Sequence, residues 1–124
     1  MDDLTSRDLE AELKKALGSR ASAYDDFQVP NPQGMTIVFA DVVVPWLLEW
    51  IQNQDFLIAA PIMHLVERMA ASEDEYVRDV FLASVLELMA EAPVELRDEF
   101  LRLAGQRTTA EYGRIYGSEV HRPE

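Results

Sequence analysis

The residues that most resemble a reactive site are His64 and Glu67, an imidazole and a carboxylate on one face of a helical pattern. Di-iron bundles use the reverse order, Glu-x-x-His, and need further carboxylates that face inward from neighbouring helices. Glu87 and Glu91 are the nearest candidates, but their spacing places them beside an apolar stripe. Zinc needs three or four ligands, and the sequence has two histidines and no cysteine. We therefore expect His64 to be a surface or core-edge residue, and we expect no metal and no other cofactor.

Motifs for nucleophilic or phosphate chemistry are missing from the sequence. It contains no Gly-x-Ser-x-Gly, Gly-x-Gly-x-x-Gly or Walker-type loop, the patterns that expose a serine or cradle phosphates. Carboxylates are abundant, but acid–base catalysis needs one that is desolvated and raised in pKa. Because no pattern singles out such a group, we expect that the protein is not an enzyme.

A more specific pattern combines acidic residues with tryptophan. Three acids and two tryptophans occur in a segment without lysine or arginine, namely Asp41, Trp46, Glu49, Trp50 and Asp55. Tryptophan is enriched at the energetic centre of protein interfaces, and the charges around it steer and select the partner. The segment therefore predicts a partner-binding surface, with the alternative that either tryptophan is a core residue.

Two shorter acidic clusters are further candidates for partner binding. Asp25 and Asp26 lie on a predicted loop, where binding residues are often placed. Glu73, Asp74 and Glu75 lie at the start of a predicted helix. Carboxylates at such a position also stabilise the positive end of the helix dipole, so a purely structural role would suffice for this second cluster.

The whole chain is strongly acidic and has the size of one domain. Its 124 residues include 11 Lys and Arg against 23 Asp and Glu, a formal net charge of −12, and 48% of them are hydrophobic. One hydrophobic core suffices at this length, so we predict a single domain over residues 1–124. The charge disfavours nucleic acid and anionic membranes and favours a cationic protein as partner.

The sequence gives no sign of secretion or membrane insertion. Its first residues, MDDL, are acidic, whereas a signal peptide begins with basic residues. The most apolar run, Val42–Leu48, is flanked by Asp41 and Glu49 and interrupted by Pro45. It is shorter than the roughly 20 apolar residues that span a bilayer. We therefore expect a cytoplasmic protein.

Apolar spacing predicts an all-α protein, a compact bundle of about five to six helices. The first helix is capped by Thr5 or Ser6, buries a leucine stripe and ends at Gly18. A connector rich in proline and glycine follows over 19–34. Residues 35–54 have the β-branched composition of a buried strand, but the apolar run is too long for one. We predict a helix from near Thr36 that bends or restarts at Pro45, with a short strand over 36–39 as the alternative.

The next two predicted helices carry most of the apolar surface. The first spans 55–71 and contains Pro61, where we expect a kink. The second is preceded by Ser72 and Glu75, which have the spacing of a capping box. It runs to about Ala92, and its broad apolar surface predicts the central helix of the bundle.

Two more helices complete the predicted bundle. One starts at Pro93 and ends at Gly105. The other is short and is opened by a second candidate capping box, Thr108 with Glu111. Residues 117–124 are expected to be a flexible tail.

Residues 74–89 resemble the second helix of a HEAT-type repeat. An acidic turn precedes Val77 and Arg78, and Leu82, Leu86 and Met89 follow at helical spacing. The sequence over 75–82 is similar to that over 94–101, with Arg-Asp followed by Phe in both. The two segments are either helical-hairpin repeats or two ordinary amphipathic helices.

In size, acidity, helical pattern and lack of catalytic motifs, the chain resembles the immunity proteins of bacterial polymorphic toxin and contact-dependent inhibition systems. The resemblance implies HEAT-like hairpins and a cytoplasmic protein that neutralises a cognate, basic toxin domain by occluding its active site. The acidic residues and tryptophans named above would then form the binding surface. The alternative is a helical adaptor or secretion chaperone that holds a segment of an effector protein in a groove.

Overall fold

The computed structural model describes residues 4–18 and 34–120. Within these ranges the backbone forms six continuous helices and no strand, so the predicted all-α bundle is confirmed. In chain order the helices are α1 (Ser6–Leu17), the helix 34–52 composed of α3 (Gly34–Val38), η2 (Phe39–Val43) and α4 (Val44–Gln52), α5 (Phe56–Ala71), the helix 75–91 composed of α6 (Glu75–Val80), η3 (Phe81–Leu86) and α7 (Glu87–Glu91), α8 (Val94–Leu103) and α9 (Gln106–Val120).

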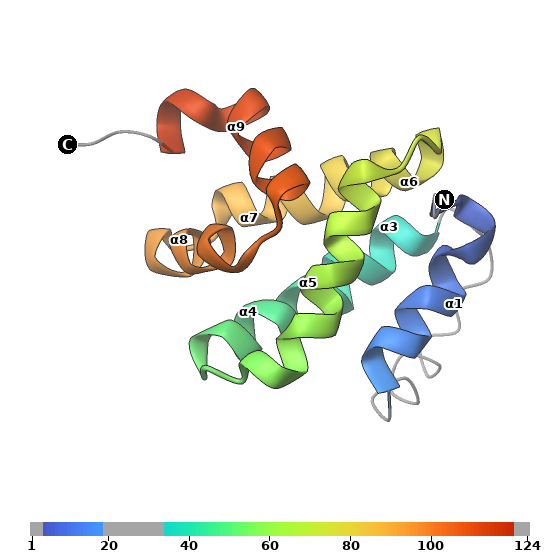
Figure 1. Cartoon of the computed structure of the whole chain (residues 1–124). Helices are drawn as coiled ribbons and strands as arrows, with labels where there is room; N and C mark the ends of the chain where they lie inside the picture. Colours follow the sequence, from blue (N-terminus) through green and yellow to red (C-terminus); the bar gives the residue numbers. More distant parts are fainter. Residues whose placement is uncertain (1–3, 19–33, 121–124) are drawn as a thin grey trace.

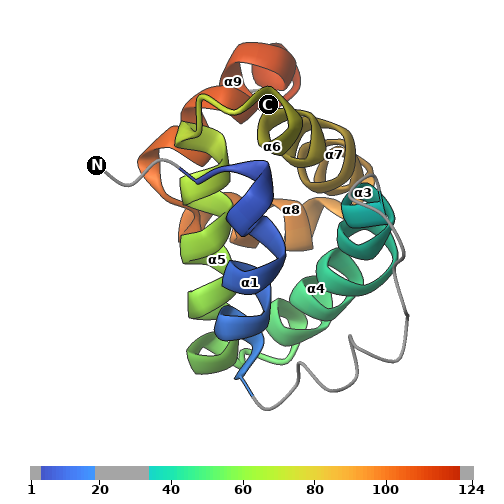
Figure 2. The ribbon, with the colours of Figure 1, turned by 90° about the vertical axis from the view of Figure 1, so that its right-hand side faces the viewer.

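Helix α5 is the central helix of the bundle: it lies between α1 and α9 (Figure 1) and runs alongside α1 (Figure 2). It packs against α1, α4, η3 and α9, while α8 packs against α4. The prediction that the helix 75–91 is the central one is therefore wrong. Its apolar surface is as wide as expected, but Leu82 and Leu88 are only partly buried, so neighbouring helices do not cover all of it.

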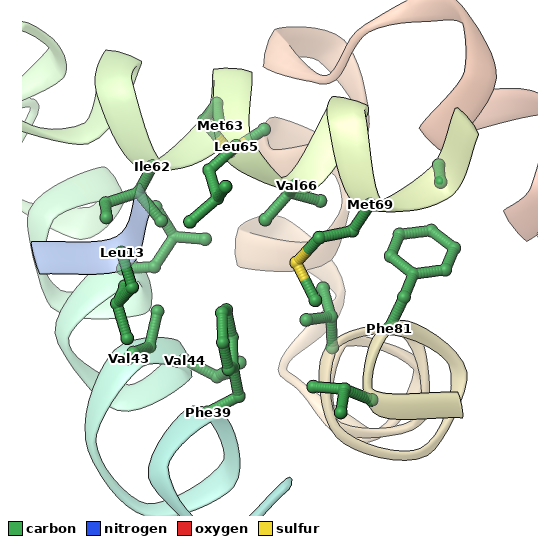
Figure 3. Close-up of a cluster of buried hydrophobic side chains, with 14 of the residues drawn as sticks. Leu13, Phe39, Val43, Val44, Ile62, Met63, Leu65, Val66, Met69 and Phe81 are labelled. Carbon is green, nitrogen blue, oxygen red and sulfur yellow. The ribbon is translucent and has the colours of Figure 1, made fainter. Parts of the chain in front are cut away.

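The hydrophobic core lies where α1, α5 and the helices 34–52 and 75–91 meet (Figure 3). Leu13 enters it from α1, Phe39 from η2, Ile62 and Met69 from α5, and Phe81 from η3, each at most 1% exposed. Burying a side chain of this kind stabilises the fold by roughly 1.5–3 kcal/mol. The helices are thus held together mainly by the apolar residues that their spacing selects.

The predicted helix and buried leucine stripe of α1 are confirmed, whereas the predicted side-chain cap is wrong, because the Thr5 hydroxyl donates to Asp8 and makes no capping hydrogen bond. Thr5 occupies the N-cap position, and Leu9, Leu13 and Leu17 are buried along one stripe. Gly18 follows the helix with a φ of 62°, in the left-handed region that glycine tolerates best. The chain can therefore turn away from α1 at this point without strain.

The helix 34–52 is helical throughout, so the alternative of a strand over 36–39 is wrong. It begins at Gly34, two residues before the predicted start, and the turn η2 is a π-helix. The N–H of Val44 donates to the carbonyl of Phe39, five residues back. Pro45 explains this geometry, because it has no N–H and its ring clashes with a regular preceding turn. The predicted disruption at Pro45 thus occurs one turn earlier, as a π-turn within an unbroken helix.

The apolar part of the same helix extends beyond the run Val42–Leu48. The window Met35–Gln52 has 18 residues and a mean hydropathy of 1.4, which by length and composition is enough to cross a membrane. In this bundle 44% of the window is buried, and the helix packs against α5, η3 and α8. The absence of membrane binding stays a prediction.

The helix 75–91 also contains a π-helical turn, which the sequence analysis did not predict. In η3 the hydroxyl of Ser84 donates to the carbonyl of Val80. At the end of η3, the N–H of Glu87 donates five residues back to Leu82. A serine hydroxyl that bonds to the carbonyl four residues earlier competes with the helical ladder and is associated with bends.

The remaining predicted boundaries differ from the structure at several points. Helix α5 continues through Pro61 without a break, and Pro93 is the N-cap of α8 rather than its first residue. The tail prediction is wrong for 117–120, because α9 reaches Val120 after a local break in helical geometry at Tyr116. Of the predicted connector 19–34, only Gly34 lies within the described residues, and 121–124 lie outside them.

Candidate functional site

The five residues of the acidic tryptophan segment lie on one helix and the turn that follows it. Asp41 is on η2, Trp46, Glu49 and Trp50 are on α4, and Asp55 is the N-cap of α5. The three acids are exposed and the two tryptophans are half-buried. We call these five residues the acidic tryptophan surface.

The two tryptophans form a contact along α4. Their ring centroids are 5.9 Å apart and the ring planes are inclined by 42°, an arrangement within the favourable range for aromatic pairs. Both rings also pack against the hydrophobic core while part of each remains accessible. Trp46 and Trp50 are therefore edge-of-core residues that present apolar area beside Glu49.

The acids of this surface have no basic partner among the residues that the structure describes. Within residues 4–18 and 34–120, the carboxylates of Asp41, Glu49 and Asp55 form no hydrogen bond or ion pair with another side chain. The sequence contains no lysine or arginine between Arg20 and Arg68. Among the described residues, no ion pair therefore neutralises the charge of these three acids.

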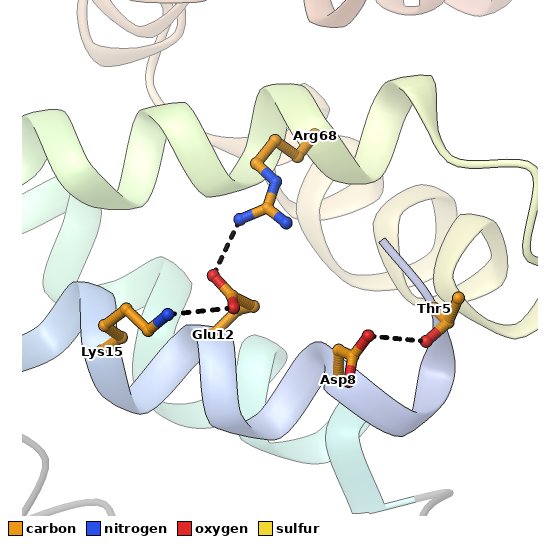
Figure 4. A network of polar contacts seen from close by, with 5 residues as sticks. All are labelled: Thr5, Asp8, Glu12, Lys15 and Arg68. Atoms are coloured by element: carbon orange, nitrogen blue, oxygen red, sulfur yellow. Dashed lines mark hydrogen bonds and ion pairs between the residues drawn. The ribbon is translucent and has the colours of Figure 1, made fainter. Parts of the chain in front are cut away.

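Several basic side chains are instead paired with acids elsewhere on the molecule. The described ion pairs include Arg68 with Glu12, Arg78 and Arg114 with Glu111, and Arg102 with Glu99. Figure 4 shows the first of them, in which Glu12 of α1 accepts from Arg68 of α5 at 2.8 Å and from Lys15 at 3.3 Å. The hydrogen bond from Arg68 lowers the pKa of Glu12. This cluster ties α1 to α5.

Asp74, one of the predicted partner-binding residues, has a structural role. Its carboxylate accepts from the N–H of Ser6 at 2.9 Å and from the N–H of Val77 at 3.1 Å. It therefore caps α6 and also holds the first residue of α1. The hydrogen bond from Ser6 is the main reason why the pKa of Asp74 lies below its usual value.

The capping box predicted for Ser72 and Glu75 is wrong. Ser72 is buried, and its hydroxyl donates to the carbonyl of Leu4 and accepts from the N–H of Asp74. The neighbouring acids Glu73 and Glu75 are exposed. Asp25 and Asp26 lie outside the described residues.

Glu67 lies on α5 but caps a different helix, α9. Its carboxylate accepts from the N–H of Arg107 at 2.7 Å and from the N–H and hydroxyl of Thr108, both at 2.9 Å. Burial alone would raise the pKa of Glu67, but these hydrogen bonds outweigh it and the pKa is lowered. Glu67 thus takes the place of an N-cap side chain for α9, which begins at Gln106.

Gly105 makes this borrowed cap possible. A Cβ atom on Gly105 would lie 2.4 Å from one oxygen of Glu67. The capping box predicted for Thr108 and Glu111 is consequently wrong. The Thr108 side chain is buried and bonds to Glu67, and Glu111 pairs with arginines.

Beside Glu67 lies a pocket that sequence reasoning missed. It has a volume of about 330 Å³ and is lined by Phe56, Ala59, Ala60, Met63, His64, Glu67, Leu103 and Gly105. Its walls come from α5, the end of α8 and the residue before α9, so only the packing of distant segments creates it. We call it the α5 pocket.

His64 and Glu67 are also the residues that suggested metal chemistry. His64 is exposed, and both carboxylate oxygens of Glu67 accept hydrogen bonds from the start of α9. In the described part of the chain, no three His, Cys, Asp or Glu residues come together as a metal site would require. In this structure the carboxylate of Glu67 caps α9.

The described residues thus combine three exposed carboxylates, a half-buried tryptophan pair and, along α5, a largely apolar pocket. The chain matches no protein family model, no curated protein and no solved structure.

Proposed function

We propose that this chain is an immunity protein that binds a cognate, basic bacterial toxin domain in the cytoplasm and neutralises it by occluding its active site. The observation that carries the proposal is the acidic tryptophan surface. Its three exposed carboxylates have no cationic partner among the described residues, and two half-buried tryptophans lie beside them. The absence of catalytic motifs from the sequence is consistent with an inhibitor that is not itself an enzyme.

The inhibitory mechanism follows from charge and contact area. A basic cleft that binds a polyanionic or acidic substrate would accept the carboxylates of Asp41, Glu49 and Asp55 instead. Opposite charges speed the encounter and select against wrong partners. Trp46 and Trp50 would supply the apolar contact that keeps the complex together, as aromatic anchors do at interface centres.

A pull-down tests this function directly. The tagged chain is used to capture partners from the source organism at low salt, and bound proteins are identified by mass spectrometry during elution with rising salt. The proposal expects one basic protein at equal stoichiometry, whose enzymatic or growth-inhibiting activity disappears on binding. A neutral partner that keeps its activity, or self-association alone, would overturn it.

Matched variants locate the binding surface. Glu49→Gln together with Asp55→Asn removes two charges from the acidic tryptophan surface. Asp79→Asn together with Glu87→Gln removes two charges from exposed positions on the helix 75–91. Only the first pair is expected to weaken capture of the partner, because the total charge changes equally in both.

The second candidate function is a helical adaptor or secretion chaperone for an effector protein. The α5 pocket and the strongly exposed Leu57, at 93%, favour it, since such a protein presents apolar surface to a segment of its client. A captured partner that retains its activity while bound would select this function over the first.

A further inference from the structure

The α5 pocket has the dimensions and lining of a site for a side chain. Its volume is about 330 Å³, and five of its lining residues are apolar. They are Phe56, Ala59, Ala60, Met63 and Leu103. Phe56 and Met63 offer aromatic and thioether surfaces, which adapt to aliphatic and aromatic groups alike.

The charge inside the pocket does not favour a cation. Glu67 is the only acid among the lining residues, and its carboxylate already accepts three hydrogen bonds from Arg107 and Thr108. The adjacent N-terminus of α9 carries the positive end of the helix dipole. An apolar group therefore fits the pocket better than an ammonium or guanidinium group.

The acidic residues near the pocket, in contrast, favour a cation. Asp55 directly precedes Phe56 in the chain, is exposed, and makes no capping hydrogen bond with its side chain. Glu49 lies on α4 at the other side of the same turn and is also exposed. A cation that lies beside an apolar group in the pocket can therefore pair with Asp55, which directly precedes the lining residue Phe56.

We propose that the α5 pocket receives one aliphatic or aromatic side chain from a basic protein segment, while a neighbouring Lys or Arg of that segment contacts Asp55. The inference rests on the proposed function, in which the partner is a basic protein. It adds that recognition needs an apolar anchor as well as charge. Interfaces of this kind concentrate their binding energy where an anchor fills a pocket.

Three blocked peptides test the inference without the natural partner. Peptides of sequence KKLKK, KKAKK and EELEE are titrated into the 15N-labelled chain, and the amide signals of Ala59, Ala60 and Met63 are followed by NMR. KKLKK is expected to shift these signals. KKAKK should bind at least about tenfold more weakly, because it lacks the methylene and methyl groups that would fill the pocket. EELEE should bind more weakly than KKLKK because it meets like charge.

A pocket-filling variant provides the second arm. Ala60 lines the pocket and is exposed, so Ala60→Phe places a ring in it, whereas Ala71→Phe adds the same ring at an exposed position at the end of α5. Ala60→Phe should weaken KKLKK binding at least about tenfold, and Ala71→Phe should leave it unchanged. Thermal unfolding of both variants shows whether they are folded, and if Ala60→Phe is not, the three peptides on the unmodified chain decide.

Equal shifts from KKLKK and KKAKK, or no shifts at the pocket, would overturn the inference while leaving the immunity function standing. Discrimination among the peptides combined with no basic protein in the pull-down would overturn the immunity function and leave the pocket as a site for basic segments.

Discussion

The borrowed cap between Glu67 and α9 leads to a quantitative prediction for stability. Glu67→Ala removes the acceptor for two backbone N–H groups and for the hydroxyl of Thr108. Losing an N-cap side chain costs about 0.5–2 kcal/mol. Thr108 is 0% exposed, and an unpaired buried donor costs about 1–3 kcal/mol. Because water can replace the bond at the exposed Arg107, we expect a total loss of about 2–3 kcal/mol in the free energy of unfolding.

Urea denaturation monitored by the fluorescence of the tryptophans measures this loss. Glu67→Gln keeps one acceptor oxygen and should cost less, about 1 kcal/mol. Glu87→Ala, an exposed acid on α7, is the control and should change stability by no more than about 0.5 kcal/mol. A loss below about 0.5 kcal/mol for Glu67→Ala would refute the reasoning, since the borrowed cap would then contribute nothing.

Gly105 provides a sharper test through a double-mutant cycle. In the natural chain, Gly105→Ala is expected to destabilise, because the new Cβ would displace the carboxylate of Glu67 from its three hydrogen bonds. In the Glu67→Ala background the same change should be neutral or stabilising by up to about 1 kcal/mol, because alanine restricts the unfolded chain. Additive effects of the two changes would contradict the contact between them.

The contribution of Glu67 to the free energy of unfolding depends on pH, and the direction of this dependence follows from its pKa. The pKa of Glu67 is lowered in the folded protein from an ordinary value of 4.5, so the folded state binds this proton less tightly than the unfolded chain. The stabilisation is complete above the ordinary pKa and is lost as the pH falls through the folded one. The difference in stability between the natural chain and Glu67→Gln should therefore be constant near neutral pH and shrink below about pH 4.5.

Three further predictions concern the cap at α6 and the binding surface. Asp74→Ala should lower the free energy of unfolding by about 1–2 kcal/mol, because α6 loses its cap and Ser6 loses its acceptor; unchanged urea denaturation would show that water replaces both bonds. Trp50→Ala should weaken partner binding by at least about 2 kcal/mol, measured by calorimetry. The helicity of the variant in circular dichroism is the control for folding. A binding free energy that differs from that of the natural chain by less than about 0.5 kcal/mol would exclude Trp50 as an anchor. Glu49→Gln with Asp55→Asn should slow association and flatten its salt dependence in surface plasmon resonance, because exposed rim charges act mainly on encounter; an effect confined to dissociation would contradict their steering role.

Much of the fold could be predicted because it depends on apolar spacing. The leucines of α1 and the stripe of α5 are separated by three and four residues, so each pattern specifies both a helix and its buried face. Even the disruption by Pro45 could be anticipated, because a missing N–H and a bulky ring act on the preceding turn whatever surrounds them. The choice of a π-turn rather than a kink depends on the neighbours and could not.

The caps could not be predicted, because their partners are far apart in sequence. A capping box is a local pattern, and Ser72 has it, yet its hydroxyl bonds to Leu4, which lies 68 residues away in the sequence. Glu67 caps a helix that begins some 40 residues later. The one sequence feature that relates to this cap is Gly105, which has no side chain to displace the carboxylate. The charge of Asp74 suits a partner and a helix cap equally well, so the sequence does not distinguish the two roles. The α5 pocket could not be predicted either, because its lining residues Phe56 and Leu103 are far apart in sequence and meet only in the folded chain.

The polar anchors of α1 have a consequence for synthesis on the ribosome. Glu12 bonds to Arg68, Leu4 to Ser72 and Ser6 to Asp74, so all three anchoring partners lie within one short stretch much later in the chain. Since α1 is translated before residues 68–74, it has none of these partners until that stretch has left the exit tunnel. Domains generally fold as units during translation. The nascent chain should therefore keep α1 undocked until the end of α5 and the turn after it have emerged, although α1 precedes them by some 50 residues in the sequence.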